Sequence, residues 1–272
     1  MDDRRDLRLL VVTAHPDDES LGFGGLLARY AAEGVETHLA TATLGERGRI
    51  GNERPGPEVV APVREAELRR AAEILGVTGL DLLGFHDGDL ERTDPALAVP
   101  RLVEVVRRAR PQVVVTFGAD GAYGHPDHIA VSQWTGAALL AAADPTFVVP
   151  GASPPHRVDK LYWMAMTAAD WEVYTEAFGE LVSRVGGVER RAAPWPDWAV
   201  TTEIDTREQW ERVWSAVQCH QSQISGYGRL AAFPLDRHVE VWGGHSLYRV
   251  FSSVDVGPGR ERDLFQGLRA GS

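Results

Sequence analysis

Two short stretches of the sequence concentrate side chains that could bind a metal ion. The stretch TAHPDDES (13–20) places one imidazole and three carboxylates within the five residues from His15 to Glu19. The stretch HPDH (125–128) adds two more imidazoles and a carboxylate. Closely spaced carboxylates repel one another, so such a cluster is stable only beside concentrated positive charge. A divalent cation held between the two stretches would supply it.

Imidazole and carboxylate ligands together favour zinc, with iron(II), manganese and cobalt as alternatives, whereas magnesium and calcium prefer oxygen ligands alone. Two histidines and one aspartate would leave one coordination position open for water, which is typical of a catalytic site. A metal ion lowers the pKa of such a water from about 15.7 towards about 7. The neighbours Asp17 and Asp18 therefore suggest one metal ligand beside one general base.

Each stretch also has a simpler interpretation. Asp17, Asp18 and Glu19 could be acids at a helix N-terminus, where the helix dipole stabilises negative charge. The stretch HPDH could be a capping turn with Pro126 at the first helical position. The metal interpretation is favoured because both stretches are expected at the ends of strands in one sheet.

Short β-branched runs alternate with helical patterns in the first half of the chain, which is typical of a parallel sheet with helices on both faces. The patterns predict strands at 8–14, 35–43, 80–85 and 111–118. They predict helices at 21–34, 61–76, 96–110 and 128–142. In open α/β sheets, ligands bind at the carboxyl ends of the strands. Since the two histidine-containing stretches follow strands 8–14 and 111–118, we expect them to converge.

The second half of the chain has a less regular pattern. It predicts strands at 159–166, 200–206 and 245–251. It predicts helices at 170–185 and 207–223. We find no internal repeat and no domain linker. The sequence therefore predicts one domain over residues 1–272, with a Rossmann-like, predominantly parallel α/β core at about 7–142. A C-terminal elaboration at about 143–272 is expected to shape the substrate site.

The composition excludes several classes of partner and site. A formal net charge of −11 argues against nucleic acid and anionic membrane as binding partners. The single cysteine, Cys219, allows neither an intrachain disulfide nor a cysteine-rich zinc site. We expect a cytoplasmic protein, because the sequence contains no signal-peptide pattern and no apolar run long enough for membrane insertion. A homo-oligomer is compatible with the sequence.

The motifs AHPDDE (14–19) and YGHPDH (123–128) resemble the two signature motifs of the PIG-L/LmbE-like deacetylase family. The stretches TLGERG (43–48), VREAELRRAAEILGV (63–77) and HQSQ (220–223) extend the resemblance. It implies a zinc-dependent hydrolase that removes the N-acetyl group from an N-acetylglucosamine-type unit of a small glycoconjugate. The YGHPDH form is most similar to the mycothiol-pathway deacetylase and amidase subset.

The resemblance implies a role for each matching residue of the metal site. One zinc ion per chain, which iron(II) could replace, would be bound by His15, Asp18 and His128. Asp17 matches the general base that activates water. His125 matches a histidine that assists the tetrahedral intermediate and the leaving amine. Whether His125 or the protonated Asp17 delivers the proton to that amine is left open by the sequence.

Further residues match positions around the substrate in the family. Tyr123 would polarise the amide carbonyl, and Asp127 would orient His125. Substrate contacts are implied for Arg64, Asp87, Glu46 and His220. The residues alone leave simpler roles open, because Arg64 lies in a charged helical pattern and His220 could be packed in the core.

Two alternatives to a deacetylase remain from the sequence. One is an amidase that removes a larger N-acyl group, as in the cleavage of mycothiol conjugates. The other is a non-catalytic sugar-binding relative that keeps the fold without turnover. The presence of Asp17 argues against the second, since binding alone does not need a general base.

Overall fold

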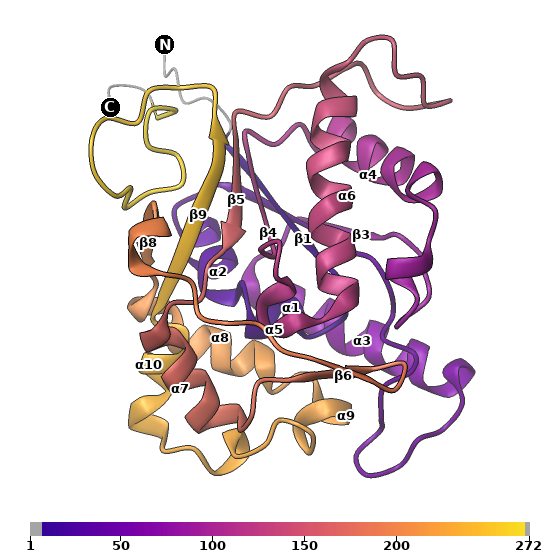
Figure 1. Cartoon of the computed structure of the whole chain (residues 1–272), viewed down its shortest axis with the longest axis vertical. Coiled ribbons are helices and arrows are strands. Elements are labelled where there is room, and N and C mark those ends of the chain that lie inside the picture. Colours follow the sequence, from indigo (N-terminus) through magenta and orange to yellow (C-terminus); the bar gives the residue numbers. More distant parts are fainter. Residues whose placement is uncertain (1–6, 270–272) are drawn as a thin grey trace.

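A central sheet brings the two motif-bearing strands side by side. The computed structural model describes residues 7–269, within which seven strands form one sheet in the order β3-β2-β1-β4-β5-β9-β8 (Figure 1). Their bounds, in sheet order, are Gly79–Leu82, Glu36–Thr41, Arg8–Thr13, Val113–Thr116, Lys160–Met164, Gly244–Ser252 and Thr202–Asp205. Strands β3 to β5 run parallel in this order, while β9 is antiparallel to both β5 and β8. The predicted, mostly parallel α/β fold is therefore confirmed.

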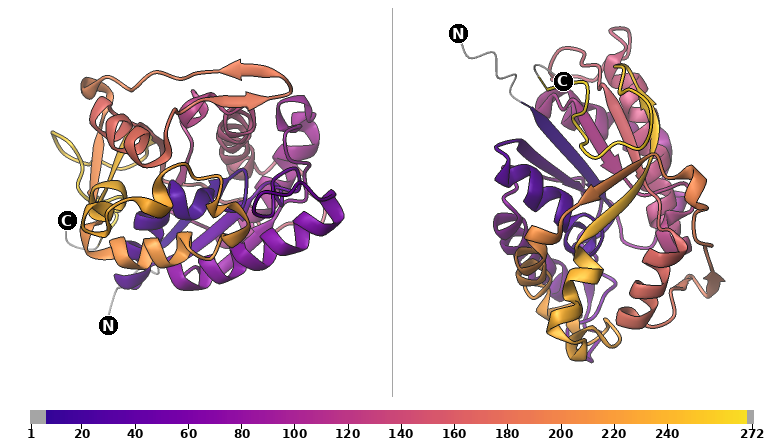
Figure 2. Two further views of the ribbon diagram at one scale, coloured as in Figure 1. Left: turned by 90° about the horizontal axis from the view of Figure 1, so that it is seen from below. Right: turned by 90° about the vertical axis from the view of Figure 1, so that its left-hand side faces the viewer.

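Helices cover both faces of this sheet (Figure 2). Helix α4 (Pro95–Ala109) packs on α6 (Pro126–Ala143) over one face. Helices α2 (Gly24–Ala32) and α3 (Pro57–Leu75) pack with α8 (Trp210–Val217) over the other. Because both faces are covered, β4 is buried along its whole length, which explains its continuous apolar sequence VVVT.

The prediction of a helix at 170–185 is wrong beyond Phe178. Helix α7 (Ala168–Phe178) ends at Gly179, and the chain continues into a two-stranded hairpin of β6 (Ser183–Val185) and β7 (Val188–Arg190). Gly179 has φ 85° and ψ −155°, a conformation that is essentially limited to glycine. The helical pattern in the sequence continued past a residue whose backbone stops the helix.

The helix expected at 207–223 is interrupted. After α8, His220 adopts a non-helical conformation with φ −82° and ψ 54°, and a short α9 (Gln221–Ile224) follows. The remaining α-helices of residues 7–269 are short: α1 (Asp18–Leu21), α5 (Gly121–Gly124) and α10 (His238–Trp242). The break at His220 turns its ring towards Glu19, as described below.

Buried apolar residues from Leu9 to Leu268 form one cluster that joins the sheet to the later helices. A buried ion pair attaches the end of the chain to the same sheet. Lys160 on β5 and Glu261 are both 0% exposed, and their charged groups lie 2.7 Å apart. Among residues 7–269, no helix combines the length and the apolar character needed to cross a bilayer.

Replacing Glu261 by glutamine should lower the free energy of unfolding by roughly 3 kcal/mol, because Lys160 stays buried without its counter-charge. Burial alone would raise the pKa of Glu261, but hydrogen bonds from Lys160 and Arg249 hold it below its ordinary value of 4.5. The ionised carboxylate therefore stabilises the fold above about this pH, and the stabilisation is lost as the pH falls further. Denaturant unfolding at neutral and at acid pH measures both effects.

A matched control is Glu176→Gln, which removes one charge from an exposed ion pair with Arg237. Exposed pairs contribute about 0–1 kcal/mol, so this variant should unfold almost like the original protein. Equal losses in the two variants would contradict a special role for the buried pair.

Candidate active site

The two motif loops meet at the carboxyl ends of β1 and β4, which are neighbours in the sheet. The first loop leads into α1, and the second leads into α6 with Pro126 in its first turn. The His125 ring caps α6 by accepting a hydrogen bond from the Asp127 N–H at 3.2 Å. The rings of His15 and His128 lie 5.4 Å apart between centroids. Side chains more than a hundred residues apart in sequence thus face a common centre.

Asp18 lies between the two histidines. Its Oδ2 is 3.5 Å from His15 Nδ1, and its Oδ1 is 3.4 Å from His128 Nε2. With bonds of about 2.0–2.1 Å to a tetrahedral zinc ion, neighbouring ligand atoms would be roughly 3.3 Å apart. His128 is 2% exposed, and among the described residues neither of its ring nitrogens has a hydrogen-bond partner. Burying an imidazole without hydrogen bonds costs folding free energy unless another group binds its nitrogens. These residues therefore fit a metal ion.

The described part of the chain contains two groups of three residues that could bind a metal ion. Within each group, the potential ligand atoms lie within 4.8 Å of one another. One is His15, His125 and His128, and the other is His15, Asp87 and Asp127. The expected set of His15, Asp18 and His128 is not one of these groups, and Asp18 contacts the two histidines with different oxygens. Each of these three sets contains at least one imidazole nitrogen. Such ligands suit a transition-metal ion better than magnesium or calcium.

Asp127 positions His15. Its fully buried carboxylate accepts hydrogen bonds from the N–H groups of Gly88 and Leu90 at 2.6 and 3.1 Å. Its Oδ2 lies 3.1 Å from His15 Nε2, on the side of the ring opposite Asp18. A carboxylate there holds the proton on Nε2 and leaves Nδ1 free to bind a metal. Asp127 thus contacts His15 through its carboxylate and His125 through its backbone N–H, and its expected role in orienting His125 stays a prediction.

Asp17 is held in a strained conformation beside this centre. Its φ of 109° is unusual for a residue other than glycine, and such strain persists only where the surroundings enforce it. Arg64 Nη2 lies 3.0 Å from its Oδ2, and the Tyr227 hydroxyl donates to the same oxygen at 2.8 Å. Burial raises the pKa of the Asp17 carboxyl despite the nearby guanidinium, which is the direction of shift expected for a general base.

Tyr227 is a site residue that the sequence did not reveal. It lies 210 residues from Asp17, in the loop after α9. Its only distinctive feature in the sequence is the pair of flanking glycines, Gly226 and Gly228, which indicate a turn and no chemistry. The contact depends on how the C-terminal elaboration folds back over the first motif.

Arg64 is buried and supports the Asp17 loop, so it is not part of an exposed charged surface. It is 5% exposed, its Nη1 donates to the Gly45 carbonyl at 2.9 Å, and its Nη2 also donates to the Pro16 carbonyl. Gly45 has φ 61°, and a Cβ atom there would lie 1.9 Å from Arg64 Nη1. The glycine in the stretch TLGERG therefore leaves space for the arginine that holds Asp17.

Asp87 and Glu46 belong to one hydrogen-bonded turn. Asp87 Oδ1 lies 3.3 Å from His15 Nε2, and its Oδ2 accepts the Arg47 N–H at 3.0 Å. Glu46 accepts the Asp87 N–H at 2.9 Å. Asp87 lines a cavity, whereas Glu46 does not, so Glu46 supports the turn instead of facing a ligand there.

Tyr123 and His125 border the same centre from α5 and the start of α6. The Tyr123 ring packs edge-on against His128 and His125, with centroid distances of 5.4 and 5.9 Å. The His125 ring stacks on His128 at 4.6 Å. The preceding Ala122 has a positive φ of 65°, so the backbone turns sharply to present both rings.

His220 is fully buried and outside the two cavities that flank the candidate metal centre. It is 0% exposed, and its Nε2 lies 2.7 Å from Oε1 of Glu19, which is also fully buried. Neither cavity described below includes His220 in its lining. The ring of His220 connects the C-terminal elaboration to α1, and its expected substrate contact stays a prediction.

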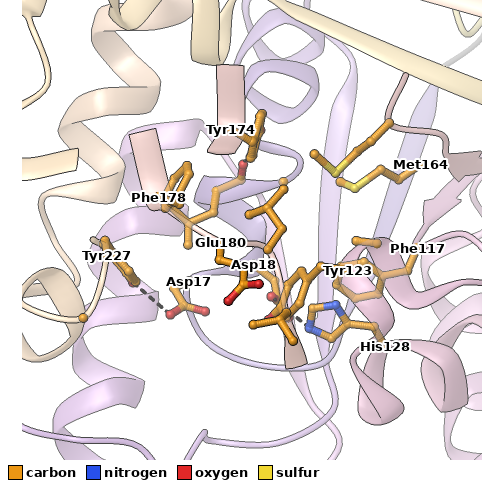
Figure 3. Close-up of a pocket in the computed structure, with 17 residues that line it drawn as sticks. Asp17, Asp18, Phe117, Tyr123, His128, Met164, Tyr174, Phe178, Glu180 and Tyr227 are labelled. Atoms are coloured by element: carbon orange, nitrogen blue, oxygen red, sulfur yellow. Dashed lines mark hydrogen bonds and ion pairs between the residues drawn. The ribbon is translucent and has the colours of Figure 1, made fainter. Parts of the chain in front are cut away.

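Two cavities of different character flank the two aspartates. A polar cavity of about 410 Å³ is lined by His15, Arg64 and Asp87, among others. An apolar cavity of about 280 Å³ lies next to it (Figure 3). Asp17, Asp18 and Tyr123 line both cavities, and the candidate metal centre is thus at their junction.

One protein family matches the motif-bearing half of the chain. Residues 10–139 match the family described as PIG-L: GlcNAc-PI de-N-acetylase. The chain is 35% identical over 289 aligned positions to a 1D-myo-inositol 2-acetamido-2-deoxy-alpha-D-glucopyranoside deacetylase from Rhodococcus jostii (strain RHA1). That alignment covers 96% of this chain and 98% of the relative.

Solved structures share the fold at lower identity. The N,N'-diacetylchitobiose deacetylase from Pyrococcus horikoshii is 18% identical with a TM-score of 0.63, over 89% of this chain and 83% of its own. The 4-carboxy-2-hydroxymuconate hydratase GalB from Pseudomonas putida KT2440 is 22% identical with a TM-score of 0.69, over 93% and 100%. Because a hydratase has the same fold, the fold alone does not determine the reaction.

Proposed function

Because this chain belongs to the PIG-L family of de-N-acetylases, we propose that it is a metal-dependent hydrolase of the N-acetyl group on an N-acetylglucosamine-type unit of a small glycoconjugate. The observation that carries this proposal is that Asp18 contacts both His15 and His128, while the adjacent Asp17 is fixed by an ion pair with Arg64. A hydrolase needs both a metal site and a separate base, and this geometry supports both in one place.

His15, Asp18 and His128 would hold the metal, which we propose to be zinc, with iron(II) as the alternative in cells. When bound, the ion would polarise the amide carbonyl and lower the pKa of the attacking water. Asp17 would take the proton of that water, since its carboxylate borders the centre and is fixed by Arg64 and Tyr227. These contacts hold the base in one position before the substrate arrives.

Tyr123 and His125 would assist the amide itself. Both lie on the wall of the polar cavity next to Asp17 and Asp18, within reach of a carbonyl at the junction. A hydroxyl or imidazole donor aimed at the developing oxyanion lowers the barrier of acyl transfer. The departing amine would take its proton from Asp17 or His125, both of which line that cavity.

The polar cavity would take the sugar. Arg64, Asp87 and Gln223 line it and offer donors and acceptors for hydroxyl groups. The relative from Rhodococcus jostii is named for a glucosaminide of inositol, a polyol. We therefore propose a glycoside with a polyol aglycone as the substrate. We further infer that the chain acts as one domain, since a single apolar cluster joins its two halves.

The direct test is metal analysis of the purified protein combined with a hydrolysis screen. The panel would contain N-acetylglucosaminyl-inositol, N,N'-diacetylchitobiose and free N-acetylglucosamine, with acetate and primary amine both quantified. We expect equal amounts of the two products, loss of both after metal removal, and recovery with zinc. A protein that binds these sugars without releasing either product would support the non-catalytic alternative.

Replacing Tyr227 by phenylalanine should lower kcat about tenfold or more, because Asp17 loses a hydrogen bond to a charged group. The metal content should stay the same, since Tyr227 is not a ligand in the proposed set. The matched control is Tyr248→Phe on β9, whose ring packs on Trp163 and Trp195 away from the site. Equal kcat values in the two variants would show that Tyr227 does not support the base.

A further inference from the structure

We propose that the apolar cavity beside Asp17 and Asp18 binds the acyl group of the substrate, and that this chain removes medium-length acyl groups, such as hexanoyl, faster than acetyl. This inference rests on the proposed amide hydrolysis and adds the class of acyl group. The bond broken is the amide C–N bond, and water supplies the new C–O bond. The products are a carboxylate and a protonated amine.

The lining of the cavity is mostly apolar. Besides the catalytic end, only Glu180 contributes a charged group, and this exposed carboxylate is paired with Arg184 and Arg191. Thioether, aromatic and aliphatic side chains surround about 280 Å³, contributed among others by Leu21, Met164, Tyr174, Phe178, Leu181 and Val182. Figure 3 shows Tyr174, Phe178 and Met164 on one side of the two aspartates. A water molecule occupies about 30 Å³ in the liquid, so the methyl group of an acetyl would leave most of this space unfilled. Apolar walls left in contact with water provide a driving force for a longer chain.

The position of the cavity favours the acyl group over the sugar. An amide has two sides, and the two cavities share Asp17, Asp18 and Tyr123 but no other lining residue. The cavity with Arg64 and Asp87 suits hydroxyl groups. Phe117 and His128 line only the apolar cavity, whereas His15 and His125 line only the polar one. With the sugar on the polar side, the acyl chain extends into the apolar side.

A further cavity of mixed polar and apolar lining adjoins the apolar cavity. This cavity of about 240 Å³ shares Gly22, Met164, Met166 and Tyr174 with the first. Methionine side chains are flexible and adapt to ligands of different length. A Cβ atom on Gly22 would lie 2.9 Å from Met164 Cε, so the glycine gives this side chain room. The Tyr174 hydroxyl is fixed by a hydrogen bond to the Leu21 carbonyl at 2.9 Å. A longer chain could therefore be accommodated by movement of the methionines.

The test compares kcat/KM for glucosaminides that differ only in the acyl group: acetyl, butanoyl, hexanoyl and octanoyl. Detecting the shared amine product makes the values directly comparable. Each buried methylene should raise kcat/KM about fourfold until the cavity is full. Hexanoate should also bind more tightly than acetate in calorimetry, which measures the cavity without turnover.

Replacing Leu181 by tryptophan should fill the cavity and lower the hexanoyl-to-acetyl ratio of kcat/KM at least tenfold. Val182→Trp is a second variant with the same expected effect, should the first one fold poorly. The control is Leu140→Trp on α6, where the side chain is 75% exposed and lies outside both cavities. This control should keep the original ratio.

Three other results would overturn the inference in distinguishable ways. Equal or falling kcat/KM from acetyl to hexanoyl would leave the deacetylase but remove the acyl-chain preference. A gain on lengthening an alkyl aglycone, with none on lengthening the acyl chain, would assign the cavity to the aglycone. Release of no amine from any substrate would overturn the proposed function, and the inference with it.

Discussion

Replacing Asp17 by asparagine should lower kcat by about a hundred- to ten-thousand-fold, the range that a positioned general base contributes. Asparagine has nearly the same shape but cannot accept a proton at neutral pH. It can still accept hydrogen bonds from Arg64 and Tyr227, so the loop should keep its conformation. The bound metal should remain, because Asp17 is not a ligand in the proposed set.

The measurement is kcat on an N-acetylglucosaminide together with metal content and thermal unfolding. Asp197→Asn serves as the control, since its side chain is 82% exposed and pairs with Arg260 at the surface. The proposed mechanism fails if Asp17→Asn keeps full activity. If the variant loses its metal, Asp17 is a ligand and the base must be sought elsewhere.

Replacing His128 by alanine should reduce the bound metal from about one ion per chain to nearly none and abolish hydrolysis. A catalytic zinc site with three protein ligands loses a third of them. The change also removes the buried imidazole whose nitrogens have no hydrogen-bond partner among residues 7–269. The apo variant should therefore fold, and added zinc should not restore activity as it does in the chelated original protein.

His156→Ala is the matched control for this variant. His156 contacts the Pro111 carbonyl at 2.7 Å, near the start of β4 and away from the motif loops. It should bind metal and turn over substrate like the original protein. A His128→Ala protein with an unchanged metal content would contradict the proposed ligand set and favour a site built on Asp87 and Asp127.

The sequence predicted most of the sheet because its strands are marked by local signals. Continuous β-branched runs such as VVVT appear wherever both faces of a strand are covered, and this pattern is visible without tertiary information. The predictions failed at Gly179 and His220, where helical periodicity continued across a break. Gly179 could have indicated the first break. Nothing local could indicate the second, because the partner of His220 is 201 residues away.

Some features of the candidate site could likewise be predicted from the sequence, and others could not. His15, Asp17 and Asp18 could be recognised because adjacent residues carry complementary chemistry at the end of one strand. The partners of Asp127 and Asp17 could not be recognised, since hydrogen bonds to His15 and Tyr227 span 112 and 210 residues. The shape of the apolar cavity was equally hidden, because segments of the C-terminal elaboration form part of its walls.

The sequence by itself determined the class of fold and the chemical types gathered in the two motifs, because strand and helix periodicity and neighbouring side chains are properties of short segments. Only the tertiary structure decided which carboxylate supports which histidine, that His220 contacts Glu19, and that an apolar cavity adjoins the polar one. Those features depend on distances between segments far apart in the chain, which are set by the packing of the whole molecule.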